Sequence, residues 1–288
     1  MIKNLKDNIL EIFSSKKSVN SKILNIFGLQ ILRYILAKIA YYLSDYFIKK
    51  KSKEIKDYEN KGYALIENFL TNEDYLKVKN EFEKIFDKKK IARNVYENKS
   101  ENNSSIDYFL YEFEDNEFNK KNFYNLYKVF KSEKIIDIFK SAERKNNITL
   151  FMRLERVVTK NDLKNDVNSH WHVDTYHNTH KAWIYLDDIK KENGPFNYIV
   201  GSNRFSFQRL VWEYVNSIKI SFYKNFLAFF LDEKKSKKFE KKKIEIICNQ
   251  NSFMIANTHG YHRRGDASIN KVRNGISFFT RENPFKLI

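Results

Sequence analysis

All six histidines of this 288-residue chain lie in two short segments, and this pairing constrains the fold more than any other feature. Two of them, His259 and His262, lie within residues 258–265. The other four lie between residues 169 and 183, at His170, His172, His177 and His180. Imidazole is a common metal ligand, so two histidine-bearing segments far apart in the sequence indicate a metal site that the fold assembles.

The sequence His172-Val173-Asp174 is the part of the first segment best suited to bind a metal. Alternate side chains of a strand point to the same face, so His172 and Asp174 would lie side by side. A histidine from another strand would complete one face of an octahedron, the ligand set that non-haem Fe(II) oxygenases use. The opposite positions would stay open for a bidentate co-substrate and O2.

Either His259 or His262 could supply the distal ligand. We prefer His262 because Arg273 follows it by eleven residues. If His262 ends one strand and Arg273 lies on the next, the arginine can point back into a barrel and bind a dicarboxylate through paired hydrogen bonds.

Other metal chemistries fit the sequence less well. A cupin-type site on His170 and His172 would need a glutamate a few residues later, and none occurs before Glu192. A structural zinc site would want thiolates, and the chain has a single cysteine, Cys248. The His-Glu-x-x-His motif of zinc proteases is absent. An ordinary cluster of polar side chains is the alternative to a metal site.

Strand patterns dominate the second half of the chain and predict a mainly β domain with supporting helices. Apolar and β-branched runs predict strands over 148–158, 182–189, 196–200, 243–248, 252–256 and 274–279. Apolar residues at helical spacing predict helices over 75–86, 121–142 and 207–232. The polar run 97–107 predicts a loop.

Residues 1–57 are predicted to form a separate helical extension. Residues 23–48 are strongly apolar, but Arg33, Lys38 and Asp45 interrupt them. A membrane-spanning helix wants roughly 20 nearly uncharged residues, so the pattern excludes a transmembrane segment. Packing of this helix on the rest of the chain is favoured, and contact with a membrane surface through residues 23–48 is the alternative.

The net charge of +17 is compatible with attraction to nucleic acid, anionic lipid or an acidic substrate. The lysines are spread widely and few arginines cluster, which is typical of a lysine-rich surface, so no specific nucleic-acid partner is expected. The lone Cys248 and the lack of an evident secretory signal predict a cytoplasmic protein, with membrane association as the alternative.

Taken together, these motifs resemble the phytanoyl-CoA dioxygenase family of Fe(II)/2-oxoglutarate oxygenases. The resemblance rests on His172-Val-Asp174, His262, Arg273, the strand-turn-strand segment 183–202 and the segment 62–74, and it spans residues 58–286. It implies a double-stranded β-helix, a jelly-roll fold similar to cupins, in a domain over 58–288. It also implies Fe(II), 2-oxoglutarate as co-substrate, and O2.

The resemblance further implies roles for individual residues. His172, Asp174 and His262 would bind the iron and be catalytic. Arg273 would bind the far carboxylate of 2-oxoglutarate, with Trp183 and Ser277 beside the co-substrate. Halogenases of this superfamily lack the carboxylate ligand, so Asp174 implies hydroxylation of a small-molecule or lipid-like substrate, with release of succinate and CO2.

Two features leave questions open at this point. Arg264 stands where the family often has a small hydroxyl residue that helps to hold 2-oxoglutarate. His170 and His259 are candidates for positions behind the metal ligands. The alternative functions are a peripheral membrane or partner-binding protein with a degenerate barrel, and a nucleic-acid oxygenase.

Overall fold

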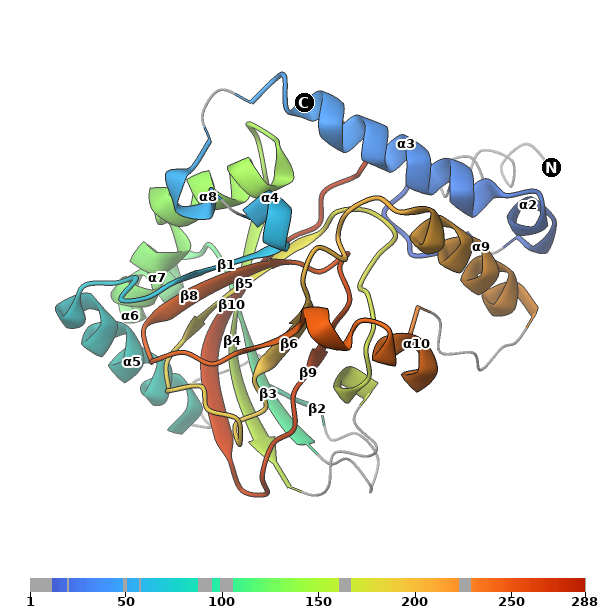
Figure 1. The fold of residues 1–288 in the computed structure, drawn as a ribbon. Helices are drawn as coiled ribbons and strands as arrows, with labels where there is room; N and C mark the ends of the chain where they lie inside the picture. The colour runs from blue at the N-terminus through green and yellow to red at the C-terminus, as the bar shows by residue number, and fades with distance from the viewer. Residues whose placement is uncertain are drawn as a thin grey trace.

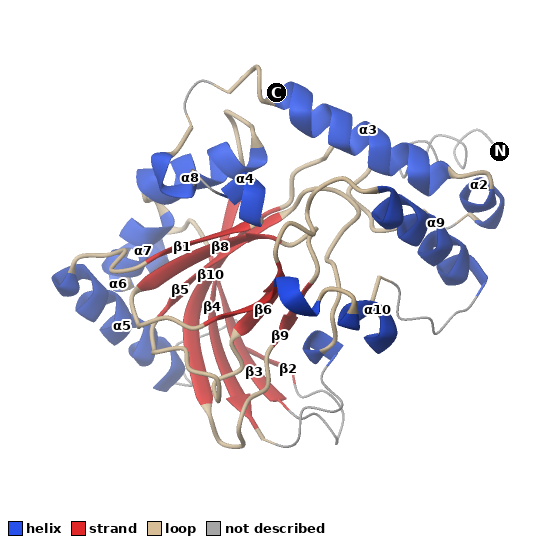
Figure 2. Cartoon of the chain, viewed as in Figure 1, coloured by secondary structure: helices blue, strands red, loops and turns tan. Residues whose placement is uncertain are grey.

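The structure is a computed structural model that describes residues 12–19, 21–48, 51–56, 58–87, 95–98, 106–160, 167–222 and 229–287. Its centre is a pair of antiparallel sheets (Figures 1 and 2). The larger sheet has the strand order β1-β8-β5-β10-β4-β3-β2, and the smaller has the order β7-β6-β9. This architecture confirms the predicted double-stranded β-helix with supporting helices.

The strands of the larger sheet are β1 (Tyr63–Ile66), β2 (Val95–Asn98), β3 (Ile106–Phe113), β4 (Leu150–Thr159), β5 (His180–Tyr185), β8 (Ser252–Asn257) and β10 (Val272–Thr280). Those of the smaller sheet are β6 (Phe196–Ile199), β7 (Lys243–Ile246) and β9 (His262–Arg264). Neighbours in the larger sheet are far apart in the sequence: β10 pairs with both β4 and β5, and β5 pairs with β8.

Helices cover the outer face of the larger sheet. They are α5 (Asn72–Asp87), α6 (Glu117–Asn122), α7 (Tyr124–Phe130) and α8 (Glu133–Glu143), with the short α4 (Tyr58–Lys61) beside β1 (Figure 1). The main core lies between these helices and the sheet, where Phe82, Leu126 and Phe139 meet Ile276 and Phe278. Because side chains alternate along a strand, the residues between these two on β10 face the other way, into the barrel.

Several predicted boundaries are wrong. The range predicted as one helix, 121–142, covers the end of α6, all of α7 and most of α8, with breaks at Phe123 and at Ser132, which caps the start of α8. The predicted loop 97–107 contains the ends of β2 and β3, with residues 99–105 outside the described part. Of the helix predicted over 207–232, the described part contains α9 (Phe207–Phe222). Residues 223–228 lie outside the described part, and Phe229 is not helical because its φ is 68°.

The N-terminal part contains α2 (Lys22–Ile26) and α3 (Leu29–Ser44), and both pack on α9. Gln30 Nε2 donates to Glu213 Oε2 of α9 at 3.2 Å, and Lys38 Nζ donates to the Asn203 carbonyl at 2.8 Å. Residues 23–48 therefore pack on the rest of the chain, which is the alternative that the sequence favoured over contact with a membrane surface. The separation at residue 57 stays a prediction, and residues 1–11, 20, 49, 50 and 57 lie outside the described part. Among the described helices, none has the length and apolar character needed to cross a membrane.

Candidate metal centre

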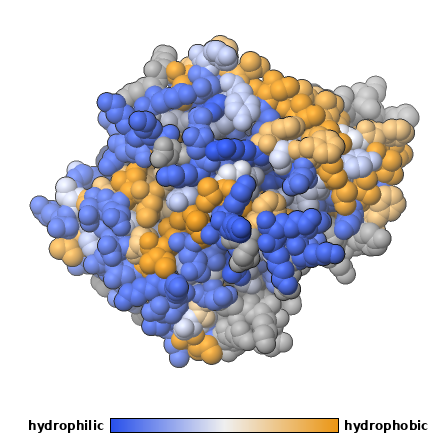
Figure 3. Space-filling model, in the orientation of Figure 1, coloured by the Kyte–Doolittle hydropathy of each residue, from blue (hydrophilic) through white to orange (hydrophobic). Residues whose placement is uncertain are grey.

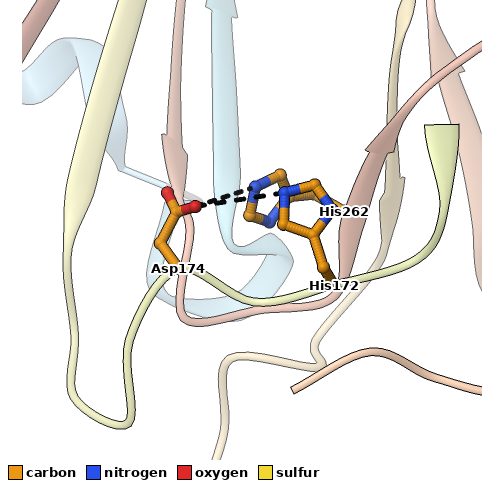
Figure 4. Close-up of side chains that lie close together, drawn as sticks. All are labelled: His172, Asp174 and His262. Atoms are coloured by element: carbon orange, nitrogen blue, oxygen red, sulfur yellow. Dashed lines mark ion pairs between the residues drawn. The ribbon is translucent and has the colours of Figure 1, made fainter. Parts of the chain in front are cut away.

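The three predicted metal ligands come together at the mouth of the barrel, between the two sheets (Figure 4). His262 begins β9, and residues 172–174 run alongside it. The backbone N–H of His172 donates to the His262 carbonyl at 2.9 Å, and the N–H of His262 returns the bond at 3.0 Å. The N–H of Asp174 donates to the Thr258 carbonyl at 3.0 Å. These bonds fix the register that brings the two segments together.

The prediction that His172 and Asp174 lie on a strand is wrong, since His172 forms only isolated bridges to His262 and Phe230. The segment is nevertheless held extended by hydrogen bonds on both sides, so the alternation on which the prediction depended still applies. His172 and Asp174 point to the same side, and His262 faces them. His262 likewise begins its strand instead of ending it.

The ligand atoms of the three residues lie within 4.8 Å of one another. Asp174 Oδ1 is 4.0 Å from His172 Nε2 and 3.7 Å from His262 Nε2. Each imidazole is held from behind: His172 Nδ1 lies 2.8 Å from the His170 carbonyl, and His262 Nδ1 lies 3.0 Å from the Gly260 carbonyl. A carbonyl only accepts, so both Nδ1 atoms carry the proton and both Nε2 lone pairs face the centre, as metal ligation requires.

The electrostatics keep the ligands in their binding forms. Burial, together with the neighbouring His172, lowers the pKa of His262 to about 3, and burial also lowers the pKa of His172. Burial alone would raise the pKa of Asp174, but the positive charge of Lys181 holds it well below its usual range. The site therefore presents two neutral imidazoles and a carboxylate, the protonation state in which these groups bind a cation.

A cavity of about 200 Å³ extends from these ligands into the barrel. Its lining includes all six residues that the sequence predicted for the site: His172, Asp174, Trp183, His262, Arg273 and Ser277. Trp183 comes from β5, and Ser277 and Arg273 come from the inward face of β10. Ser277 Oγ donates to Glu155 Oε1 at 2.6 Å, and Arg273 Nη1 donates to the Gly194 carbonyl.

Arg264 lines the same cavity as Arg273, so the departure from the family pattern lies within the predicted co-substrate site. Burial and the charge of Arg273 lower the pKa of the Arg264 guanidinium well below its usual range. Arg264 and Arg273 are two of the five cationic side chains that line this cavity, against two carboxylates, so an anionic guest is favourable there. The cavity is suited to a small dianion.

Lys181 is a residue that the sequence reading missed. It lies on β5, and its Nζ is 2.9 Å from Asp174 Oδ2. The carboxylate thus has one oxygen facing the histidines and the other facing the lysine. Lys181 is two residues before Trp183 on the same strand, so period-two alternation from Trp183 could have placed it at the site.

The other histidines of the two segments lie outside the ligand set. His180 is fully buried with its Nδ1 3.0 Å from Glu143 Oε1, and His259 is fully buried with its Nδ1 3.2 Å from Arg209 Nη2. His177 is buried, and its Nδ1 lies 2.8 Å from the Asn178 carbonyl. His170 touches the centre only through its carbonyl, which anchors His172.

The fold and the site define a class: a double-stranded β-helix with a His-x-Asp and distal His cluster at the mouth of its barrel. The sequence model of the phytanoyl-CoA dioxygenase (PhyH) family matches residues 58–243, and the chain belongs to this family. The match includes His172 and Asp174, while His262 and Arg273 lie beyond its end. The family uses Fe(II), 2-oxoglutarate and O2, which confirms the predicted cofactors.

Two solved structures with similar folds are both 13% identical to this chain. One is the epimerase SnoN in complex with Fe3+, alpha ketoglutarate and nogalamycin RO, with a TM-score of 0.52 over 80% of this chain and 82% of that one. The other is AviO1 from Streptomyces viridochromogenes Tue57, with a TM-score of 0.50 over 82% of this chain and 96% of that one. At this identity the likeness concerns the fold. A search of curated proteins found no match.

Proposed function

We propose that this protein is an Fe(II)- and 2-oxoglutarate-dependent dioxygenase that hydroxylates a small-molecule or lipid-like substrate. One observation carries the proposal: six residues chosen from the sequence, from segments as distant as 172 and 277, line a single cavity. Convergence of this kind is what a binding site assembled by the fold requires, and it argues against a degenerate barrel.

His172, Asp174 and His262 would hold the iron. The tautomers of the two imidazoles fit this role. Each Nδ1–H donates to a backbone carbonyl, so both Nε2 atoms are unprotonated and face Asp174 Oδ1. Two nitrogens and one carboxylate oxygen are the donor set of non-haem Fe(II) oxygenases. Lys181, ion-paired with the other carboxylate oxygen, would leave Asp174 a single oxygen for the metal.

Arg273 would bind the distal carboxylate of 2-oxoglutarate, with Arg264 adding positive charge to the same pocket. Ser277 and Trp183 would complete the walls on the adjacent strands. Arg264 would thus help to hold 2-oxoglutarate, as the small hydroxyl residue at this position often does in the family. The cavity lining has five cationic side chains and two carboxylates, a positive balance that favours the dianion 2-oxoglutarate.

When bound, the iron and co-substrate supply the oxidising chemistry: 2-oxoglutarate is converted to succinate and CO2, and one oxygen atom enters a substrate C–H bond. The protein's own residues position the reactants. The presence of Asp174 supports hydroxylation, since the carboxylate occupies the position that a halide would need. A small-molecule or lipid-like substrate is proposed on the membership of the chain in the PhyH family.

The proposal is tested by anaerobic loading with Fe(II) and 2-oxoglutarate, followed by a screen of small molecules and lipids for O2-dependent succinate formation. We expect saturable 2-oxoglutarate binding and substrate-stimulated turnover, with label from ¹⁸O2 in the organic product. An Asp174→Ala variant serves as the inactive control. Iron-loaded protein that neither binds 2-oxoglutarate nor turns it over with any compound would refute the assignment, and a product without label would refute hydroxylation.

A further inference from the structure

Helix α3 buries its polar residues together with four apolar or aromatic ones, and the residues that it exposes to solvent are all apolar or aromatic. Its buried residues include Gln30, Arg33, Lys38 and Ser44, and Arg33 is only 1% exposed. Its exposed residues are Leu32, Ile39, Tyr42 and Leu43. A helix on the surface of a globular protein normally has the opposite arrangement, with its apolar stripe facing the core.

Helix α9, which packs against α2 and α3, has the same reversed arrangement. Arg209, Glu213 and Asn216 are buried, whereas Phe207, Val211 and Phe222 are exposed. The two helical segments meet through polar contacts: Asn25 Nδ2 donates to Ser221 Oγ at 2.8 Å, and the Tyr214 hydroxyl donates to the Ile26 carbonyl at 2.9 Å. Polar contacts join the helices alongside an apolar one, in which Ile35 and Leu210 pack with Tyr34, and apolar side chains cover much of their outer surface.

The result is a continuous apolar area over α2, α3 and α9, which we call the outer helical face. Figure 3 shows it as the large orange region at the upper right. Its most exposed members are aromatic: Phe27 is 85% exposed, Tyr46 84% and Phe207 74%. A monomer in water rarely leaves large contiguous apolar areas bare, and such areas usually mark a contact with another surface.

The charges around the outer helical face are mainly positive; the carboxylate of Asp45, next to Tyr46, is partly exposed and pairs with Lys51 and Arg144. Over the described residues of α2, α3 and α9 there is no exposed carboxylate: the one acidic residue, Glu213, is fully buried and paired with Arg209. Exposed lysines lie at the margin, at Lys16, Lys22 and Lys219. Lys22 lies over the Phe222 ring at 5.2 Å, so a cation is in direct contact with the apolar area.

A cavity of about 530 Å³ lies at one end of this face, between α9 and α10 (Glu233–Lys237). Its apolar walls include Val211, Val215 and Phe239. Its cations include Arg204, Lys235, Lys238 and Lys242, and none of its described lining residues is acidic. Apolar walls with a basic rim fit an acyl chain joined to an anionic headgroup.

We propose that the outer helical face binds the surface of an anionic phospholipid bilayer, with α2, α3 and α9 lying in the plane of the interface. Interfacial helices bury an apolar face at the boundary of the acyl region while basic residues contact the headgroups. A second copy of the chain is a poorer occupant, because pairing two such faces would bring their basic margins together. This inference does not depend on the reaction at the metal centre.

The test is flotation of the full-length protein with vesicles of phosphatidylcholine alone and with added phosphatidylglycerol. The variant Leu32→Gln/Ile39→Gln/Leu43→Gln alters only exposed positions of α3. The control Leu76→Gln/Phe118→Gln/Tyr124→Gln removes equally exposed apolar side chains from α5, α6 and α7. Circular dichroism and Fe(II) binding report whether each variant keeps its fold.

We expect wild type and the control variant to float with anionic vesicles, and the α3 variant to partition at least about tenfold less. Lys238→Glu/Lys242→Glu should weaken binding to anionic vesicles and leave the neutral ones unaffected. Failure of the wild type to float with any vesicle would overturn the proposal. So would a wild-type dimer in sedimentation that the α3 variant converts to a monomer, because a second copy would then occupy the face.

Discussion

Replacing Arg273 with glutamine is the perturbation that separates the co-substrate site from the metal site. Arg273 projects from β10 into the cavity that Arg264, Trp183 and Ser277 also line. Glutamine keeps part of the side-chain volume and a hydrogen-bond donor, but it removes the charge and the planar fork that binds a carboxylate through two bonds. Metal binding by His172, Asp174 and His262 should be unaffected.

The magnitude follows from the bonds lost. A hydrogen bond to a charged group contributes roughly 1.5–3 kcal/mol, so losing the paired contact costs about 3–4 kcal/mol. Each 1.4 kcal/mol is tenfold in affinity, which predicts a 2-oxoglutarate Kd weaker by roughly 10²- to 10³-fold. Arg264→Gln removes a neighbouring charge from the same cavity and should weaken binding by a smaller factor.

The assay is anaerobic calorimetric titration of 2-oxoglutarate into Fe(II)-loaded protein, with the Kd for Fe(II) measured separately. The matched control is Arg281→Gln, which removes an exposed arginine just after β10 whose guanidinium stacks on Phe279 at 5.5 Å. Its 2-oxoglutarate Kd should equal that of the wild type. If Arg273→Gln also binds 2-oxoglutarate as tightly as the wild type, the place assigned to the co-substrate is wrong.

Three further predictions test the site and its support. Asp174→Ala should abolish tight Fe(II) binding in an anaerobic competition assay with a chelator, and wild-type affinity in this variant would contradict the ligand assignment. Burial lowers the pKa of His177 to about 4, whereas the pKa expected in an unfolded chain is near 6.5. Between about pH 6.5 and pH 4 the unfolded chain therefore binds a proton that the folded protein does not, and this residue destabilises the metal-free protein as the pH falls. The wild type should lose about 2 kcal/mol more of its free energy of unfolding between pH 7 and pH 5 than His177→Gln does, as measured in urea melts. The same loss in both proteins would contradict the role given to His177. Gly260→Ala would place a Cβ 2.0 Å from the Tyr198 hydroxyl, so we expect the variant to be destabilised by about 1–3 kcal/mol. Fe(II) binding should also weaken, because the Gly260 carbonyl behind His262 would be displaced. A variant as stable as the wild type would show that Tyr198 can move.

The sequence was most informative where chemistry and strand periodicity coincide. His172 and Asp174 could be paired because alternate residues of an extended segment share a face, and the cavity contains both. The spacing between His262 and Arg273 predicted two adjacent segments returning to one place. These inferences needed only local geometry and the residue types that iron and dicarboxylates require.

Other features depend on contacts that no local pattern contains. The helix predicted over 207–232 was made too long because its last aromatic residues look helical, while Phe230 bridges to His172. The contact of Lys181 with Asp174 depends on how β5 lies beside the metal segment. Residues 23–48 were recognised as apolar, but the sequence could not show that Arg33 and Lys38 face inward, because that depends on polar partners supplied by other segments.

The central claim is that His172, Asp174 and His262 bind iron beside a 2-oxoglutarate held by Arg273. A crystal structure of the protein grown anaerobically with Fe(II) and 2-oxoglutarate tests it most directly. We predict one metal bound by His172 Nε2, His262 Nε2 and one oxygen of Asp174, with the far carboxylate of 2-oxoglutarate on Arg273. Iron on His170, His177 or His259 instead, or 2-oxoglutarate bound away from Arg273, would contradict the account.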